Sequence, residues 1–150
     1  FFMFFAPQLV FAQIPDDYEL MKKYTLQKDA VEMKTLVDMD SLKVFGNKPF
    51  TGFAYERYPD QKLYQVVSYR RGLQHGPMMV WYPDGSPQLY TNYRMGSPHG
   101  RFVGWYTNGR VIYNLVLNQG KLGGDFLYEE DDSRMATETE VIEIEGTDND

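Results

Sequence analysis

The chain contains two histidines, His75 and His99, which are the first residues to consider for metal binding or acid–base chemistry. They lie 24 residues apart, and no acidic residue recurs beside them. The chain also has no cysteine, whereas a zinc site needs three or four converging ligands. We therefore predict no metal site and no cofactor, and we assign both histidines a role in stabilising turns.

Three short polar side chains, Asp60, Asp84 and Asn108, follow the same spacing and are the candidates for acid–base catalysis or calcium binding. Paired catalytic carboxylates face each other across a cleft, but each of these residues stands alone in a segment typical of a hairpin turn. Asp and Asn in such turns hydrogen-bond the backbone. No nucleophile–base pair, metal cluster or phosphate-binding loop is visible, so we predict that the protein is not an enzyme.

Aromatic residues repeat with the same 24-residue period and are candidate binding residues. They are Trp81 and Trp105, and Tyr58, Tyr82 and Tyr106. Adjacent residues on a strand point to opposite faces, so the Trp row and the Tyr row cannot both be buried in a single-layer sheet. Either both rows are structural, one in the groove of a curled sheet and one under a terminal segment, or one row is exposed and binds a protein or a glycan.

Basic residues recur as well, and they mark a second candidate binding surface. Arg70 and Arg94 occupy one repeated position, and Lys62 and Arg110 another. Such a row is either a solvated edge of the sheet or a surface for phosphates, anionic lipid head groups or an acidic protein.

The charges divide the chain into unlike parts. Residues 45–124 carry nine bases and three acids, a net charge of +6, whereas residues 125–150 carry eleven acids and one base, a net charge of −10. The opposite charges of these two segments suggest the hypothesis that the acidic tail lies along the basic segment and masks it.

The element that positions all these residues is a repeat of 24 residues. Glycines keep the same period in two series: Gly52, Gly76, Gly100 and Gly124, and Gly72, Gly96 and Gly120. After each glycine of the first series we expect a strand of about six residues, such as 77–82. A turn and a longer second strand follow, at 63–69, 87–93 and 111–117, with alternate residues such as Leu63, Gln65, Val67 and Tyr69 on one face. Asp-Gly and Asn-Gly favour hairpins, so we predict an all-β fold: an elongated antiparallel sheet of tandem β-hairpins.

The segments on either side of residues 45–128 differ from the repeat. Residues 1–12 are apolar and end in Val10-Phe11-Ala12, which predicts a signal peptide remnant and an exported protein, with an N-terminal strand as the alternative. Residues 13–44 are expected to form a leader: a segment of low order or one short helix, then one or two strands. Residues 129–150 are predicted to be an acidic tail.

The repeat resembles a known family. The blocks 76–85 (GPMMVWYPDG) and 93–100 (YRMGSPHG) resemble the MORN-repeat variant, the short hairpin repeat of bacterial proteins labelled YwqK-type toxin–antitoxin system antitoxins. The resemblance covers roughly residues 42–128. Two departures are Gln61, which stands where a turn glycine is expected, and the fourth repeat, which breaks off. The resemblance implies a non-catalytic binding or scaffold role.

These observations favour an exported interaction module, antitoxin- or immunity-like, that binds an unknown protein partner on its sheet. The alternative is an envelope protein that binds glycan or anionic lipid through aromatic and basic rows. No nucleic acid partner is expected.

Overall fold

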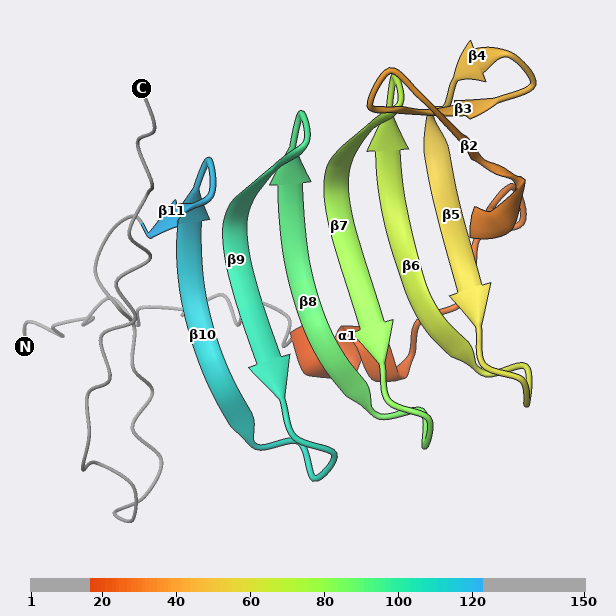
Figure 1. The fold of residues 1–150 in the computed structure, drawn as a ribbon. Coiled ribbons are helices and arrows are strands. Elements are labelled where there is room, and N and C mark those ends of the chain that lie inside the picture. Colours follow the sequence, from red (N-terminus) through yellow and green to blue (C-terminus); the bar gives the residue numbers. More distant parts are fainter. Residues whose placement is uncertain (1–16, 123–150) are drawn as a thin grey trace, which may run out of the picture.

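The computed structural model describes residues 17–122 and contains one eight-stranded sheet (Figure 1). From β5 onward each strand lies beside the next strand of the sequence and is antiparallel to it. These strands are β5 (Gly52–Arg57), β6 (Leu63–Arg70), β7 (Leu73–Trp81), β8 (Pro87–Arg94), β9 (Ser97–Trp105), β10 (Val111–Asn118) and β11 (Lys121–Leu122). The prediction of a mainly β protein made of sequential hairpins is confirmed.

One edge of the sheet departs from the expected antiparallel order. β1 (Val31–Glu32) pairs in parallel with β5, with Val31 opposite Ala54 and Glu32 opposite Tyr55. Parallel neighbours need a long connection, and the segment between β1 and β5 supplies one. The antiparallel prediction is wrong for this pair of strands.

The leader is more structured than one or two strands. It begins with α1 (Asp17–Lys22), which agrees with the short-helix alternative. After β1 come a 3₁₀ turn, η1 (Met33–Thr35), and two strands of a separate three-stranded sheet, β2 (Val37–Met39) and β3 (Leu42–Phe45). The third strand of that sheet, β4 (Lys48–Pro49), lies in the segment predicted to be the repeat array. The signal peptide in residues 1–12, Gly124 and the acidic tail lie outside the described residues and stay predictions.

Two-residue turns join the second strand of each hairpin to the next hairpin, and we call them the glycine turns. Their residues all have positive φ: Arg71 and Gly72 (51° and 82°), Met95 and Gly96 (47° and 87°), and Gln119 and Gly120 (50° and 78°). Positive φ at both positions defines the type I′ turn, which matches the twist of the strands it joins. The three glycines donate their N–H groups to carbonyls of the preceding turn region: Gly72 to Phe50, Gly96 to Gln74 and Gly120 to Pro98.

The opposite ends of the hairpins carry five-residue turns, 58–62, 82–86 and 106–110. In each turn, one oxygen of the expected Asp or Asn accepts the N–H two residues later: Asp60 from Lys62, Asp84 from Ser86, and Asn108 from Arg110. This confirms the turn-capping role of the three side chains. Gln61 adopts a φ of 72° where Gly85 and Gly109 have 88° and 82°, a conformation that costs a non-glycine residue about 1 kcal/mol or more.

Gly76 and Gly100 lie inside strands rather than before them, which corrects the expected strand start. β7 and β9 begin three residues earlier, and both glycines have φ near 90° (93° and 91°). The pairing of β6 with β7 shifts beside Gly76, between Val67 and Tyr69. These glycines therefore form bulges, where an added residue bends the strand. A Cβ on Gly76 would also lie 3.1 Å from the Ser68 hydroxyl oxygen.

The two faces of the sheet carry separate apolar clusters. The leader face contains Val66, Met79, Trp81, Val103 and Trp105, with Met21 of α1 packed on them. Figure 1 shows α1 lying across this side of the strands. The second cluster lies on the opposite face and contains Leu36, Phe50, Ala54, Val67 and Tyr69.

Leu63 does not share a face with Val67 and Tyr69 as expected. Leu63 packs on the leader-face cluster, whereas Val67 and Tyr69 belong to the other. The reason is a shift in the pairing of β5 with β6, where Glu56 is opposite Gln65 and Arg57 is opposite Leu63. The skipped residue, Tyr64, reverses the alternation at this point.

Candidate functional site

Trp81 and Trp105 lie in the core under the leader, with exposed fractions of 4% and 3%. Trp81 Nε1 donates to the carbonyl oxygen of Met21 over 3.1 Å. Tyr18 meets the Trp105 ring edge-on, with ring centroids 5.5 Å apart. Of the two alternatives for this row, the structure shows the structural one, because α1 occupies the surface of both rings.

The Tyr row links neighbouring hairpins. The hydroxyl group of Tyr58 donates to the carbonyl oxygen of Trp81, and that of Tyr82 to the carbonyl oxygen of Trp105, each over 2.8 Å. These tyrosines follow the last residue of their strands and belong to the turns, which corrects the placement of Tyr82 in a strand. The Trp rings therefore pack on the leader face, while Tyr58 and Tyr82 link hairpins from the turns, so the two rows do not need the same face of the sheet. Tyr106, the third member of the row, is 51% exposed.

The basic residues Arg70 and Arg94 are exposed at the ends of β6 and β8, beside the glycine turns. His75 lies close by in β7, and its Nδ1 accepts the N–H of Met95 over 3.2 Å, as expected for a turn-stabilising residue. His99 has the equivalent position in β9, and its Nδ1 is buried without a described hydrogen-bond partner. No cluster of three metal-ligating side chains occurs within residues 17–122.

Segments within residues 17–122 cover only part of the width of the face opposite the leader. One row of paired residues crosses five strands of this face: Val67, Met78, Thr91, Phe102 and Leu115. At the β6 and β7 end of the row, Val67 belongs to the cluster around Leu36 and Phe50, and Met78 packs against it. Its far end, on β9 and β10, is half-buried and packs on neither buried cluster. We call this uncovered part, formed by Leu89, Phe102, Tyr113, Leu115 and Leu117, the open face.

Aromatic stacking organises the centre of the open face. The rings of Phe102 and Tyr113 stack with centroids 5.2 Å apart and planes 20° apart. Gly104 lies beneath Tyr113, so close that an added Cβ would come within 2.4 Å of the ring. Desolvation by burial raises the pKa of the Tyr113 phenol above its ordinary value. Sequence reasoning missed these two aromatic residues because neither repeats with the 24-residue period.

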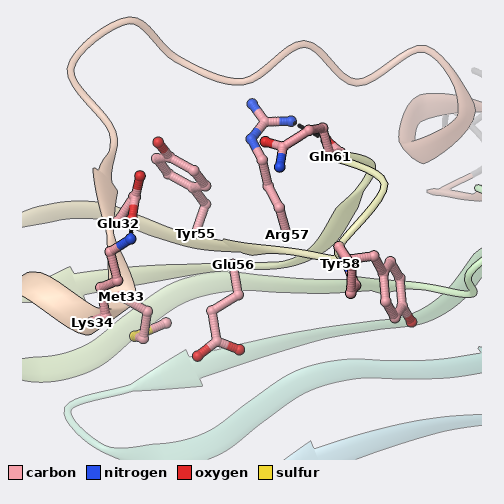
Figure 2. Close-up of a pocket in the computed structure, with 9 residues that line it drawn as sticks. Glu32, Met33, Lys34, Tyr55, Glu56, Arg57, Tyr58 and Gln61 are labelled. Carbon is pink, nitrogen blue, oxygen red and sulfur yellow. Dashed lines mark hydrogen bonds and ion pairs between the residues drawn. The ribbon is translucent and has the colours of Figure 1, made fainter.

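A cleft of about 450 Å³ lies at the edge of β5 (Figure 2). One wall is formed by Glu32 and Lys34, and the other by Tyr55 to Tyr58 and Gln61. Figure 2 shows Tyr55 and Arg57 on one side of the β5 ribbon and Glu56 on the other. No sequence pattern predicts this cleft, because it depends on where β1 stops pairing with β5.

Comparisons with family models, with curated proteins and with solved structures find no match for this chain. No helix within residues 17–122 is long and apolar enough to cross a membrane.

Proposed function

We propose that the protein is an exported, non-catalytic interaction module, antitoxin- or immunity-like, built from tandem 24-residue hairpins of the MORN-variant type. The tandem arrangement is supported by hydrogen bonds that recur in step. The Tyr58–Trp81 and Tyr82–Trp105 bonds are related by 24 residues, and so are the three bonds of the glycine turns. A hairpin that relies on its neighbour for such contacts is the unit of a repeat protein.

The observation that carries the binding role is the open face. Exposed contiguous apolar surface marks a site of interaction with a protein, a ligand or a membrane. Leu89, Phe102, Tyr113 and Leu115 form a half-buried, partly exposed apolar patch on the sheet, and the two aromatic rings are already held by stacking. Large aromatic side chains with little freedom to lose dominate protein–protein interfaces. A protein partner is therefore the occupant we favour.

Adjacent residues of β10 offer a matched test, because Leu115 pairs with Phe102 on the open face and Asn114 pairs with Val103 on the leader face. A photo-crosslinking p-benzoylphenylalanine placed at Leu115 should give a protein adduct of one discrete mass in the cells that make the protein. The same group at Asn114 should give little or none. Equal adducts from both positions, or glycan and lipid adducts alone, would contradict the proposal.

A second candidate is the binding of anionic lipid or an acidic glycan by the exposed bases at the glycine turns. Arg70, Arg71 and Arg94 form no ion pair with any residue of the described range. Salt-sensitive retention on vesicles containing phosphatidylglycerol, lost in Arg70→Gln/Arg94→Gln, would favour this candidate.

A further inference from the structure

The cleft at the edge of β5 lies where a strand stops short. β1 pairs with β5 only at Ala54 and Tyr55, and after Glu32 the chain turns away into η1. Among residues 17–122, no strand pairs with the outer side of β5 at Glu56 or Arg57. The unpaired edge of a strand offers N–H and C=O groups to a further strand, and here those groups adjoin a cleft of about 450 Å³.

Side chains of opposite charge project from the two faces of β5 at this unpaired edge. On one side, the Arg57 guanidinium lies over the Tyr55 ring, 5.2 Å from its centroid, and donates to the carbonyl oxygen of Gln61 over 2.7 Å. On the other side, Glu56 Oε2 accepts from the neutral amide of Gln65 over 2.7 Å. Neither charge forms an ion pair with any residue that the structure describes.

The facing wall does not neutralise these charges. Glu32 and Lys34 form an ion pair with each other over 2.5 Å, so together they contribute no net charge to the cleft. The hydrogen bond to Glu32 raises the pKa of Lys34, which keeps the amine charged. Arg57 and Glu56 therefore remain the two unneutralised charges beside the strand edge.

We infer that this cleft binds an extended peptide segment of another protein. The segment pairs with β5 at Glu56 and Arg57, beyond the end of β1, and it carries a basic residue followed directly by an acidic one. Strand addition gains affinity from backbone hydrogen bonds and specificity from alternate side chains. Since successive side chains of a strand point to opposite faces, a residue opposite Glu56 and the next one, opposite Arg57, meet opposite charges.

The order of the two peptide residues follows from β1. A segment that continues the parallel pairing of Glu32 with Tyr55 reaches Glu56 first and Arg57 second. The basic residue therefore precedes the acidic one. The guanidinium of Arg57 keeps N–H donors beyond the one used by Gln61, and a planar guanidinium suits a carboxylate. This inference is independent of the open face and of the function proposed for it.

An NMR titration of the full chain tests the inference, with acetyl-Thr-Val-Lys-Glu-Val-Thr-amide as the probe. The amide signals of Glu56 and Arg57 should shift. A peptide with Gln-Gln in place of Lys-Glu should bind at least about fourfold more weakly, because it lacks two exposed ion pairs that each contribute roughly a factor of two to five to affinity. Methylation of one of the two backbone nitrogens, that of Lys or that of Glu, should abolish binding and methylation of the other should not, because only one of two successive N–H groups faces β5. Equal affinity for all these peptides, or shifts confined to other strands, would overturn the inference.

Variants of the cleft separate charge recognition from a folding defect. Glu56→Gln and Arg57→Gln should each weaken binding of the Lys-Glu peptide about twofold to fivefold. Lys121→Gln, an exposed position in β11 at the opposite edge of the sheet, should leave its affinity unchanged. The double variant Glu56→Lys/Arg57→Glu should prefer a Glu-Lys peptide over the Lys-Glu one. Unchanged preference in this double variant would contradict the assignment of the two charges, whatever the crosslinking from Leu115 shows.

Discussion

Tyr82 joins two hairpins through one hydroxyl group. Its side chain leaves the turn after β7 and donates to the carbonyl oxygen of Trp105, the last residue of β9. Tyr106 has the same position one hairpin later but is 51% exposed. The two residues therefore allow the energy of the link to be measured against a matched site.

Replacing Tyr82 by Phe should lower the free energy of unfolding by about 1 kcal/mol, because a half-buried carbonyl loses its donor. Tyr106→Phe should change it by less than about 0.5 kcal/mol, as expected for an exposed side chain. Urea denaturation of both variants measures the difference. Equal effects of the two substitutions would show that the link contributes nothing specific.

Tyr113 should make stability depend on pH in the alkaline range. Burial raises its pKa in the folded state, so its contribution to stability is fully present below the ordinary tyrosine pKa of about 10 and is lost as pH rises through the raised value. The stability of the protein should therefore fall relative to that of Tyr113→Phe as pH rises above about 10. Urea denaturation at several pH values measures this, and parallel pH profiles for the two proteins would contradict it.

At the scale of elements, the short helix α1 has a packing role larger than its length suggests. Met21 is 2% exposed among the leader-face residues, and Tyr18 contacts Trp105. Its neighbour Leu20 is 55% exposed. A helix this short is unstable alone in water, so its order depends on the sheet beneath it.

Met21→Ala should destabilise the protein by about 2–5 kcal/mol, the usual cost of emptying a buried methionine site. Leu20→Ala should cost less than about 0.5 kcal/mol, because Leu20 contributes little buried surface. Denaturation followed by tryptophan fluorescence reports on the contact directly, since Trp81 donates to the Met21 carbonyl. A similar loss in both variants would contradict the docking of α1 on this face.

The strands and turns could be predicted because their signals are local. Positive φ at turn positions favours Gly, Asn and Asp, and the period of these residues gave the hairpins and the capping roles of Asp60, Asp84 and Asn108. The bulges at Gly76 and Gly100 could not be predicted in the same way. The sequence does not show whether a glycine adopts positive φ in a turn or in a bulge. Only the pairing of β6 with β7, and of β8 with β9, distinguishes the two.

At the scale of the whole molecule, the leader determines which surfaces remain for binding. α1 covers the Trp row, and η1 with the segment around Leu36 and Phe50 covers the first strands of the other face. Among the residues that the structure describes, the surfaces left for binding are the open face on β8 to β10, the basic glycine turns and the cleft beside β5. The candidate residues Tyr106, Arg70 and Arg94 lie at the surface, whereas Trp81 and Trp105 do not.

Neither the open face nor the cleft could be predicted from the sequence, for one physical reason. Both depend on contacts between segments that are distant in sequence: β1 with β5, and η1 with β6. Periodicity shows which residues share a row, but it does not show which end of that row another segment covers. Phe102 and Tyr113 belong to different strands and meet only through the pairing of β9 with β10.

The central claim is that consecutive hairpins lie side by side, so that residues 24 apart are neighbours along one sheet. Because the chain contains no cysteine, spin labels can be attached to single cysteines introduced in pairs at the exposed residues Arg70, Arg94 and Asn118. Two strand spacings separate each step, so the backbones are about 10 Å apart for the 70–94 pair and about 20 Å apart for the 70–118 pair. The distance between the two labels, measured by electron spin resonance, should therefore be longer for the 70–118 pair. A 70–118 distance equal to or shorter than the 70–94 distance would contradict the stacking of hairpins in a row.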